Sequence, residues 1–426
     1  MIPFFVMFVL KIYFMKNSTF KYSNLKGSLL IGLFIFTIGI ILQSIFGNFP
    51  YTKLKFPVNL FVFAEFFFIT LALWILFRKK KFIQWLSSAN AAIASIALFT
   101  LVVTIMAVFP QGKTELKIIQ LLGFNSVIFT WYYALSVAFL LLILGLSTLR
   151  RIKPFKGRNI PFFINHFGLW LAMTTALLGF ADKQQAMMPV HTNQLVWFAE
   201  TSSKEIIELP FALKLQQFVV NYHPPKIALL NKNGEAYQIK GDQFAEVQKN
   251  KKMQIGAYHI IINDFFNDAF FLEDSIINRP NSVGTTVAAQ ASVFKNKQKV
   301  AAEWLSPGNY MFPGKYIHLH PDSILVLLDP EPSYYGSEVM LYTQSGIKDK
   351  AESISVNAPL STEGWMVYQH SYDNRFGKDS PYSVFSVVRD PWLPYVYIGI
   401  FLMMIGGIWL IFAKVISKKS PKIEEL

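Results

Sequence analysis

Six long apolar runs dominate the hydrophobic pattern of this chain. Each is about 20 residues long, which is the length that a helix needs to cross roughly 30 Å of hydrocarbon. The runs are Gly27–Phe46, Val58–Phe77, Ala91–Val108, Val127–Leu149, Phe162–Phe180 and Leu393–Phe412. We therefore expect a polytopic α-helical membrane protein with six spans, in contact with lipid.

The segment from about 181 to 390, between the last two runs, has a different pattern. It is polar, alternates in hydrophobicity and is interrupted by turn residues such as Pro307-Gly308 and Pro313-Gly314. Short alternating runs between turns are typical of β-strands, and the segment is long enough to enclose its own core. The pattern predicts a large β-rich domain between the last two spans.

Four regions follow from these patterns. Residues 1–86 hold a lead-in and a pair of spans, 87–182 three further spans, 183–390 the β-rich domain, and 391–426 the last span and a tail. Residues 1–15 are interrupted by Lys11 and lack the small-residue cleavage site of a secretory signal. We expect them to form a cytoplasmic or interfacial lead-in.

Basic residues indicate how the spans are oriented. Lys and Arg gather at 78–81, 150–158 and 414–422, after the second, fourth and sixth runs, whereas the opposite loops carry four lysines, Lys53, Lys55, Lys113 and Lys117. Because short basic loops stay on the cytoplasmic side, both termini are predicted to be cytoplasmic. The β-rich domain is then extracytoplasmic.

Composition narrows the range of functions. The chain is 53% hydrophobic with a net charge of +14, but the basic excess flanks the membrane and no nucleic-acid-binding signature is present, so we expect no nucleic-acid partner. It has no cysteine, which excludes thiol–disulfide exchange and a Cys-x-x-Cys-His heme attachment site within this chain. Hydrolase, zinc-protease and phosphate-loop motifs are also missing.

His166 stands out because it is the one histidine of seven that falls inside a predicted span. An ionisable side chain is costly to keep in a membrane and often marks a working site. Heme, quinone or a proton are the candidate cargoes for an imidazole there. The alternative is an ordinary helix-end histidine at headgroup depth.

Several short strings follow one another in a distinctive order from about Ser87 onward. They are Pro110-Gln111, Trp131-Tyr132-Tyr133, Arg150-Arg151, His166-Phe167-Gly168, Gly179, Leu209-Pro210-Phe211, Tyr222-His223-Pro224, Tyr382-Ser383-Val384 and Val388-Arg389-Asp390-Pro391-Trp392-Leu393-Pro394. This order resembles that of the ResB (CcsB-like) family of cytochrome c biogenesis proteins, the smaller membrane component of System II.

The resemblance implies a heme-handling subunit in the cytoplasmic (inner) membrane of a bacterium. It would bind heme b in transit, with His166 as an axial ligand of the heme iron, and help to deliver it across the membrane. A CcsA-type partner that carries the tryptophan-rich WWD segment would complete the machinery, and apocytochrome c would receive the heme. We expect a non-catalytic subunit of a holocytochrome c synthase complex rather than an enzyme by itself.

Two features depart from the family pattern. The first two spans precede the four-span core expected of the family, and no tryptophan-rich cluster is present. Two alternatives stay open. One is a cytochrome b-like subunit that passes electrons from quinol, and the other is a structural anchor for an extracytoplasmic assembly domain.

Glu65 is a second polar residue in a predicted span, about eight residues and roughly 12 Å from its start. An ionised carboxylate is costly at that depth. We favour a neutral acid that is hydrogen-bonded inside the bundle. The alternative is a contact with the partner or with a polar group on the heme route.

His318 and His320 are spaced to share one face of a strand, which is compatible with a metal site. No third ligand lies nearby in the sequence. We favour a solvated strand face for this pair.

Overall fold

The computed structural model describes residues 23–152, 157–231, 233–235, 244–273, 275–320, 323–343 and 346–419, without the side chains at 158, 320, 346–350 and 413–419. The chain forms two compact units, which we call the helical unit (residues up to 183 and from 390) and the β unit (Gln184–Arg389). The lead-in expected at residues 1–15 and the end of the expected tail lie outside the described residues.

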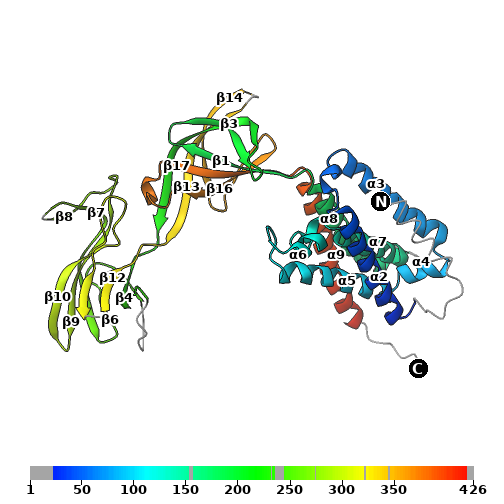
Figure 1. Ribbon diagram of the computed structural model, residues 1–426, viewed down its shortest axis with the longest axis horizontal. Helices are drawn as coiled ribbons and strands as arrows, with labels where there is room; N and C mark the ends of the chain where they lie inside the picture. Colours follow the sequence, from blue (N-terminus) through cyan, green and yellow to red (C-terminus); the bar gives the residue numbers. More distant parts are fainter. Residues whose placement is uncertain are drawn as a thin grey trace. The chain divides into compact units, whose positions relative to one another are not determined.

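Among the described residues, six helices of the helical unit are long and apolar enough to cross a membrane, as the sequence predicts (Figure 1). They are α2 (Leu25–Phe46), α3 (Val58–Phe77), α5 (Ala89–Val108), α7 (Trp131–Ile152), α8 (Ile160–Gly179) and α9 (Leu393–Lys419), with the shorter α4 (Lys81–Leu86) and α6 (Lys117–Leu122) between them.

Among the predicted helix starts, the largest difference is in α7, which begins at Trp131 and not at Val127. Residues Val127–Phe129 form a separate 3-10 turn, η2. The hydroxyl of Thr130 then accepts a hydrogen bond from the N–H of Tyr133 at 3.3 Å. A threonine hydroxyl that satisfies a free N–H of the first turn favours the start of a helix at this point.

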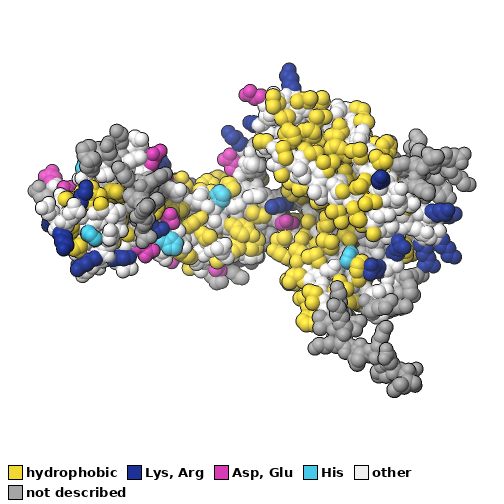
Figure 2. All heavy atoms as spheres, turned by 90° about the horizontal axis from the view of Figure 1, so that it is seen from below, with side chains coloured by type: hydrophobic (Ala, Val, Ile, Leu, Met, Phe, Trp, Pro, Cys, Tyr) yellow, Lys and Arg dark blue, Asp and Glu magenta, His cyan; other side chains and the backbone are white. Residues whose placement is uncertain are grey.

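Large apolar side chains cover the outside of these helices (Figure 2). Phe61, Leu76 and Val108 are 69%, 70% and 67% exposed, respectively. Proteins that are surrounded by water rarely expose so continuous an apolar surface, whereas lipid tails solvate it well. The helical unit therefore indicates a membrane location.

The first of the two additional helices belongs to the core of the helical unit. Ile31 and Ile35 of α2 are buried in a cluster with residues of α5 and α7. A Cβ added to Gly39 would lie 2.5 Å from the Cβ of Tyr132, so α2 and α7 approach closely because this position has no side chain. Thus α2 is an integral part of the bundle.

The β-rich region that the sequence predicts is present, and in chain order its strands follow α8 and precede α9. The strands are β1 (Gln184–His191), β2 (Leu195–Thr201), β3 (Ile206–Tyr222), β4 (Lys226–Asn231), β5 (Phe244–Glu246), β6 (Lys252–Ile255), β7 (Tyr258–Phe271), β8 (Ile276–Asn278), β9 (Thr286–Lys295), β10 (Gln298–Leu305), β11 (Ile317–His320), β12 (Ser323–Leu327), β13 (Pro332–Thr343), β14 (Gly346–Ser355), β15 (Leu360–Thr362), β16 (Trp365–Tyr372) and β17 (Tyr382–Arg389).

These strands form three antiparallel sheets. The largest has the order β14-β13-β3-β2-β1-β17-β16-β15, and the others have the orders β10-β9-β7-β6, with β8 beside β7, and β11-β12-β4-β5. The two smaller sheets share one buried core, which includes Ile260 and Leu325. The largest sheet has a separate core around Phe385.

The first and last strands of the β unit are neighbours. Gln184 of β1 pairs with Arg389 of β17, and the register continues to His191 and Tyr382. The alternating burial of β1 and β17 places Met188 and Val387 in the core of the largest sheet. The chain therefore enters and leaves the β unit at adjacent points of one sheet.

Candidate functional site

His166 lies on α8, about 9 Å from the start of the helix at 1.5 Å per residue. Its side chain is half-buried. No other histidine occurs in residues 1–183 or 390–426 of the sequence. The helical unit therefore offers a single imidazole.

The orientation of the His166 ring is set by the preceding turn of α8. Its Nδ1 donates a hydrogen bond to the carbonyl oxygen of Phe162 at 3.1 Å, and the two rings stack with their centroids 3.7 Å apart. Because a carbonyl can only accept, Nδ1 carries the proton and the neutral ring keeps its lone pair on Nε2. No described residue hydrogen-bonds to Nε2. This tautomer is the one that ligates a metal through Nε2.

The glycine of the His166-Phe167-Gly168 string brings α9 against α8. A Cβ on Gly168 would lie 2.6 Å from the carbonyl oxygen of Gly399. Nearby, Asn165 donates a hydrogen bond from Nδ2 to the carbonyl oxygen of Met403 at 2.7 Å. Residues two positions apart on a helix point about 200° apart. The close contact with α9 therefore leaves His166 on the opposite side of α8.

Arg151, at the end of α7, reaches the same turn of α8. Its guanidinium carbon lies 4.4 Å from the centroid of the Phe162 ring. Its backbone carbonyl accepts a hydrogen bond from Nδ2 of Asn159 at 2.9 Å. The adjacent Arg150 donates to the carbonyl oxygens of Gln84 and Ser87, which follow the basic segment 78–81. Figure 2 shows Lys and Arg side chains gathered on one part of the helical unit. His166 is thus near a basic end of the helical unit.

Sequence reasoning did not single out Phe162 and Arg151 as neighbours of His166. The spacing of four residues between Phe162 and His166 is a signal for a contact on one helix face. The contact with Arg151 depends on how α7 and α8 pack, and no local pattern reports it.

At the opposite end of α8, Asp182 holds the helix to neighbouring segments through hydrogen bonds. Its carboxylate accepts hydrogen bonds from the backbone N–H of Phe56 at 2.8 Å, from Asn59 Nδ2 at 2.7 Å and from Trp392 Nε1 at 2.7 Å. Burial by itself raises the pKa of Asp182, but these hydrogen bonds outweigh it and hold the pKa below its usual value. The network joins the segment before α3, the end of α8 and the start of α9.

At this end of α8, Gly179 contacts Trp392, and both residues belong to the short strings on which the family resemblance rests. A Cβ on Gly179 would lie 2.5 Å from Cγ of Trp392. Only a glycine lets the indole lie across the last turn of α8, where its Nε1 reaches Asp182. These positions therefore have a structural role.

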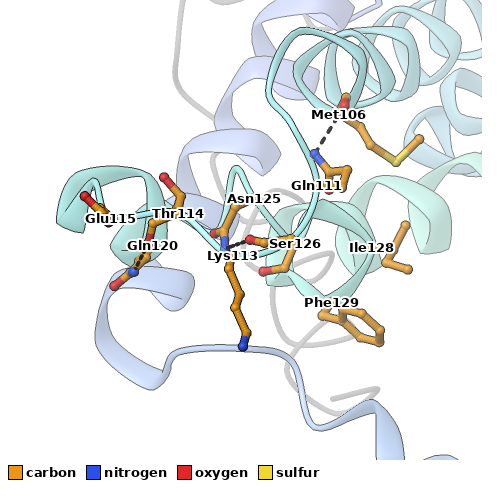
Figure 3. Close-up of a pocket in the computed structure, with 11 residues that line it drawn as sticks. Met106, Gln111, Lys113, Thr114, Glu115, Gln120, Asn125, Ser126, Ile128 and Phe129 are labelled. Atoms are coloured by element: carbon orange, nitrogen blue, oxygen red, sulfur yellow. Dashed lines mark hydrogen bonds between the residues drawn. The ribbon is translucent and has the colours of Figure 1, made fainter. Parts of the chain in front are cut away.

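A cavity of about 960 Å³ lies in the loop between α5 and α7 (Figure 3). Gln111 organises this loop, since its Nε2 donates to the carbonyl oxygens of Met106, Phe109 and Phe124 at 3.2, 2.8 and 3.0 Å. Its Oε1 accepts from the N–H of Val127 at 3.1 Å. The Pro110-Gln111 string therefore shapes a loop, and its amide is already fully engaged.

Glu65 is exposed on α3, and no described residue hydrogen-bonds to it. The sequence favoured a Glu65 side chain that is hydrogen-bonded inside the bundle, and the structure does not show this arrangement. Phe61 and Phe68, one turn before and after it, are 69% and 63% exposed. Glu65 places a carboxylate in the middle of an apolar helix face.

Of the histidine pair of β11, the structure describes the side chain of His318, and that of His320 lies outside the described residues. His318 is exposed and meets Tyr316 edge-on at 5.2 Å. The pairing with β12 shifts register between His318 and His320. No group of three or more His, Cys, Asp or Glu residues that could hold a metal occurs among the described residues.

The β unit has a second cavity of about 1400 Å³ that sequence reasoning did not predict. At its margin Lys378, in the turn η4 (Gly377–Asp379), contacts Asp268 of β7 and lies 2.6 Å from the hydroxyl of Thr285. Asp379 accepts a hydrogen bond from the N–H of Gly284 at 2.7 Å. Burial raises the pKa of Tyr222, which lines the cavity, to about 12.

Comparisons with known proteins do not identify a family for this chain. No protein-family model matches the chain, and no curated protein matches it. A solved structure titled "Cytochrome c Heme Lyase CcmF" is similar with a TM-score of 0.26 and 8% sequence identity, over 92% of this chain and 46% of that chain. This chain thus spans about half the length of that structure. A TM-score of this size does not establish a shared fold, and nothing about function follows from it.

Proposed function

We propose that this chain is a membrane subunit of cytochrome c maturation that binds heme b in transit through His166. The orientation of the imidazole carries the proposal, because its hydrogen bond to Phe162 leaves the Nε2 lone pair available on a half-buried face. Neutral imidazole is a common axial ligand of heme iron. The apolar ring of Phe162, which stacks on the imidazole, suits the face of a porphyrin.

The resemblance to the ResB family supports the same reading and adds the partners. Heme would enter near the basic end of the helical unit, which we assign to the cytoplasmic side of a bacterial inner membrane. Since the chain has one intramembrane histidine, the second axial ligand comes from a CcsA-type partner or from water. The covalent attachment to apocytochrome c would take place in the assembled System II complex, of which this chain is a non-catalytic part.

The remaining parts of the chain would connect this site to its partners. The β unit, with its first and last strands paired, is a scaffold on the extracytoplasmic side for the partner and the apocytochrome. Glu65 is a contact with a membrane helix of the partner, because an exposed carboxylate at that depth needs a donor that lipid cannot supply.

The test is the visible absorption spectrum of the complex purified with its CcsA-type partner. In His166→Gly the heme bands should weaken strongly, and added imidazole should restore them by replacing the missing ligand. His318→Ala, which removes an exposed histidine of the β unit, is the control and should keep its bands. Bands that persist unchanged in His166→Gly would place the ligand elsewhere.

The spectrum also separates the two alternatives. A cytochrome b-like electron carrier normally holds its heme permanently between two histidines, so its bands would survive purification and respond to quinol. A purely structural anchor would show no heme, even with the partner present.

A further inference from the structure

We infer that Arg151 binds a propionate carboxylate of the heme and makes the site selective for porphyrins with free acid groups. This inference rests on the proposed function, since it names a second anchor point for the same ligand. It starts from a continuous stack in which the guanidinium of Arg151 lies over Phe162 and Phe162 lies over His166.

The stack limits the distance between the guanidinium of Arg151 and the imidazole of His166. The guanidinium carbon lies 4.4 Å from the Phe162 centroid, and that centroid lies 3.7 Å from the His166 centroid. The guanidinium is therefore at most about 8 Å from the imidazole. A macrocycle whose iron is bound by His166 would thus have a cation beside its edge.

Arg151 has no carboxylate partner among the described residues. The acidic residues between positions 23 and 183 are Glu65, Glu115 and Asp182, and no ion pair joins any of them to Arg151. The adjacent Arg150 differs, because its guanidinium donates to the carbonyl oxygens of Gln84 and Ser87. Arg150 is engaged by the protein, whereas the guanidinium of Arg151 stacks on Phe162, has no hydrogen bond or ion pair to a described residue, and is exposed.

The chemistry of the two groups is complementary. Heme b has apolar faces and two carboxylates on one edge, so it binds best where an apolar wall ends at a water-exposed cation. A guanidinium presents a planar fork that accepts a carboxylate through two hydrogen bonds. The Phe162 ring holds the plane of that fork, and the position of Arg151 at the end of α7 keeps the carboxylate near water.

The experiment compares hemin with its dimethyl ester, which has the same iron and macrocycle but no carboxylate. Each is titrated into the full chain, purified with its partner and stripped of heme, and binding is followed at the main visible absorption band. Wild type should bind hemin about tenfold or more tightly than the ester, as a charge-assisted pair of hydrogen bonds implies. In Arg151→Gln this preference should disappear, while affinity for the ester stays unchanged.

Two further variants sharpen the test. Arg151→Lys keeps the charge without the fork and should retain part of the preference. Arg78→Gln removes a charge from the C-terminal end of α3, which is not part of the stack of Arg151, Phe162 and His166, and it should retain all of the preference.

The outcomes distinguish this inference from the proposed function. If hemin binds and depends on His166, but Arg151→Gln keeps the wild-type preference, the inference is overturned while the proposed function stands. An equal loss of both ligands in Arg151→Gln would show a structural role and would also overturn it. If neither ligand binds wild type, or binding ignores His166, the proposed function itself fails.

Discussion

Gly168 of α8 lies directly against the backbone of Gly399 of α9, so closely that a Cβ on Gly168 would be 2.6 Å from the carbonyl oxygen of Gly399. Tight contacts of this kind replace the hydrophobic effect as the main attraction between helices in lipid. The contact also determines which side of α8 is left for His166, because the two positions point in nearly opposite directions.

The first prediction concerns this contact. Gly168→Ala should separate α8 from α9 and cost about 1–3 kcal/mol, as overpacking does in protein cores. Thermal unfolding of the purified protein in detergent measures the loss. Gly157→Ala is the matched control, because a Cβ at Gly157 would meet no described residue within 4 Å. Equal stability of the two variants would mean that α9 adjusts freely to the added methyl group.

A second prediction follows from the depressed pKa of Asp182. Its pKa is lower in the folded protein than in the unfolded chain, so its contribution to stability is present above the ordinary value of about 4 and is lost as the pH falls through the folded value. Asp182→Asn should lower the unfolding temperature at neutral pH and flatten its decline below about pH 4.

Unfolding temperatures measured from pH 7 downward test this second prediction. Glu115→Gln removes a carboxylate that has no hydrogen-bond partner among the described residues, and it serves as the control. An acid decline that is as steep in Asp182→Asn as in wild type would assign the acid sensitivity to other groups.

The third prediction concerns the exposed carboxylate of Glu65. If it contacts a polar group on a helix of the proposed CcsA-type partner, Glu65→Leu should reduce recovery of that partner in co-purification, and Glu65→Gln should retain much of it through a hydrogen bond. Phe68→Leu, an apolar exchange on the same exposed face, should have little effect. Full recovery of the partner with Glu65→Leu would mean that this face of α3 meets lipid.

The fourth prediction concerns the contact of Lys378 with Asp268 and Thr285 in the β unit. Both charged side chains are partly exposed, at 30% and 23%, so Lys378→Met should cost only about 1 kcal/mol. Hydrogen exchange at Gly284 and its neighbours should nevertheless rise, because the contact holds that loop to η4. Arg375→Met, which breaks a local pair with Asp373, should leave exchange at Gly284 unchanged.

The six apolar helices and the β-rich region were predictable because both depend on local patterns. A helix in hydrocarbon must satisfy its own backbone, so a long apolar run is sufficient to indicate it. The start of α7 was predicted four residues too early. The residues of η2 are apolar and extend the hydrophobic run, but they are not part of the helix.

The sequence by itself also selected His166, because the cost of an ionisable group depends only on its presence in an apolar run. It did not determine the exposure of Glu65, since α3 is apolar on all sides and has no polar face that would mark which residues point outward. Only the tertiary structure decided that α9 takes the Gly168 side of α8, that Arg151 comes from α7 to lie over Phe162, and that Asp182 accepts hydrogen bonds from both the start of α3 and the start of α9. The physical reason is that these contacts join residues far apart in the chain, and their partners are set by the packing of whole helices, which no local pattern reports.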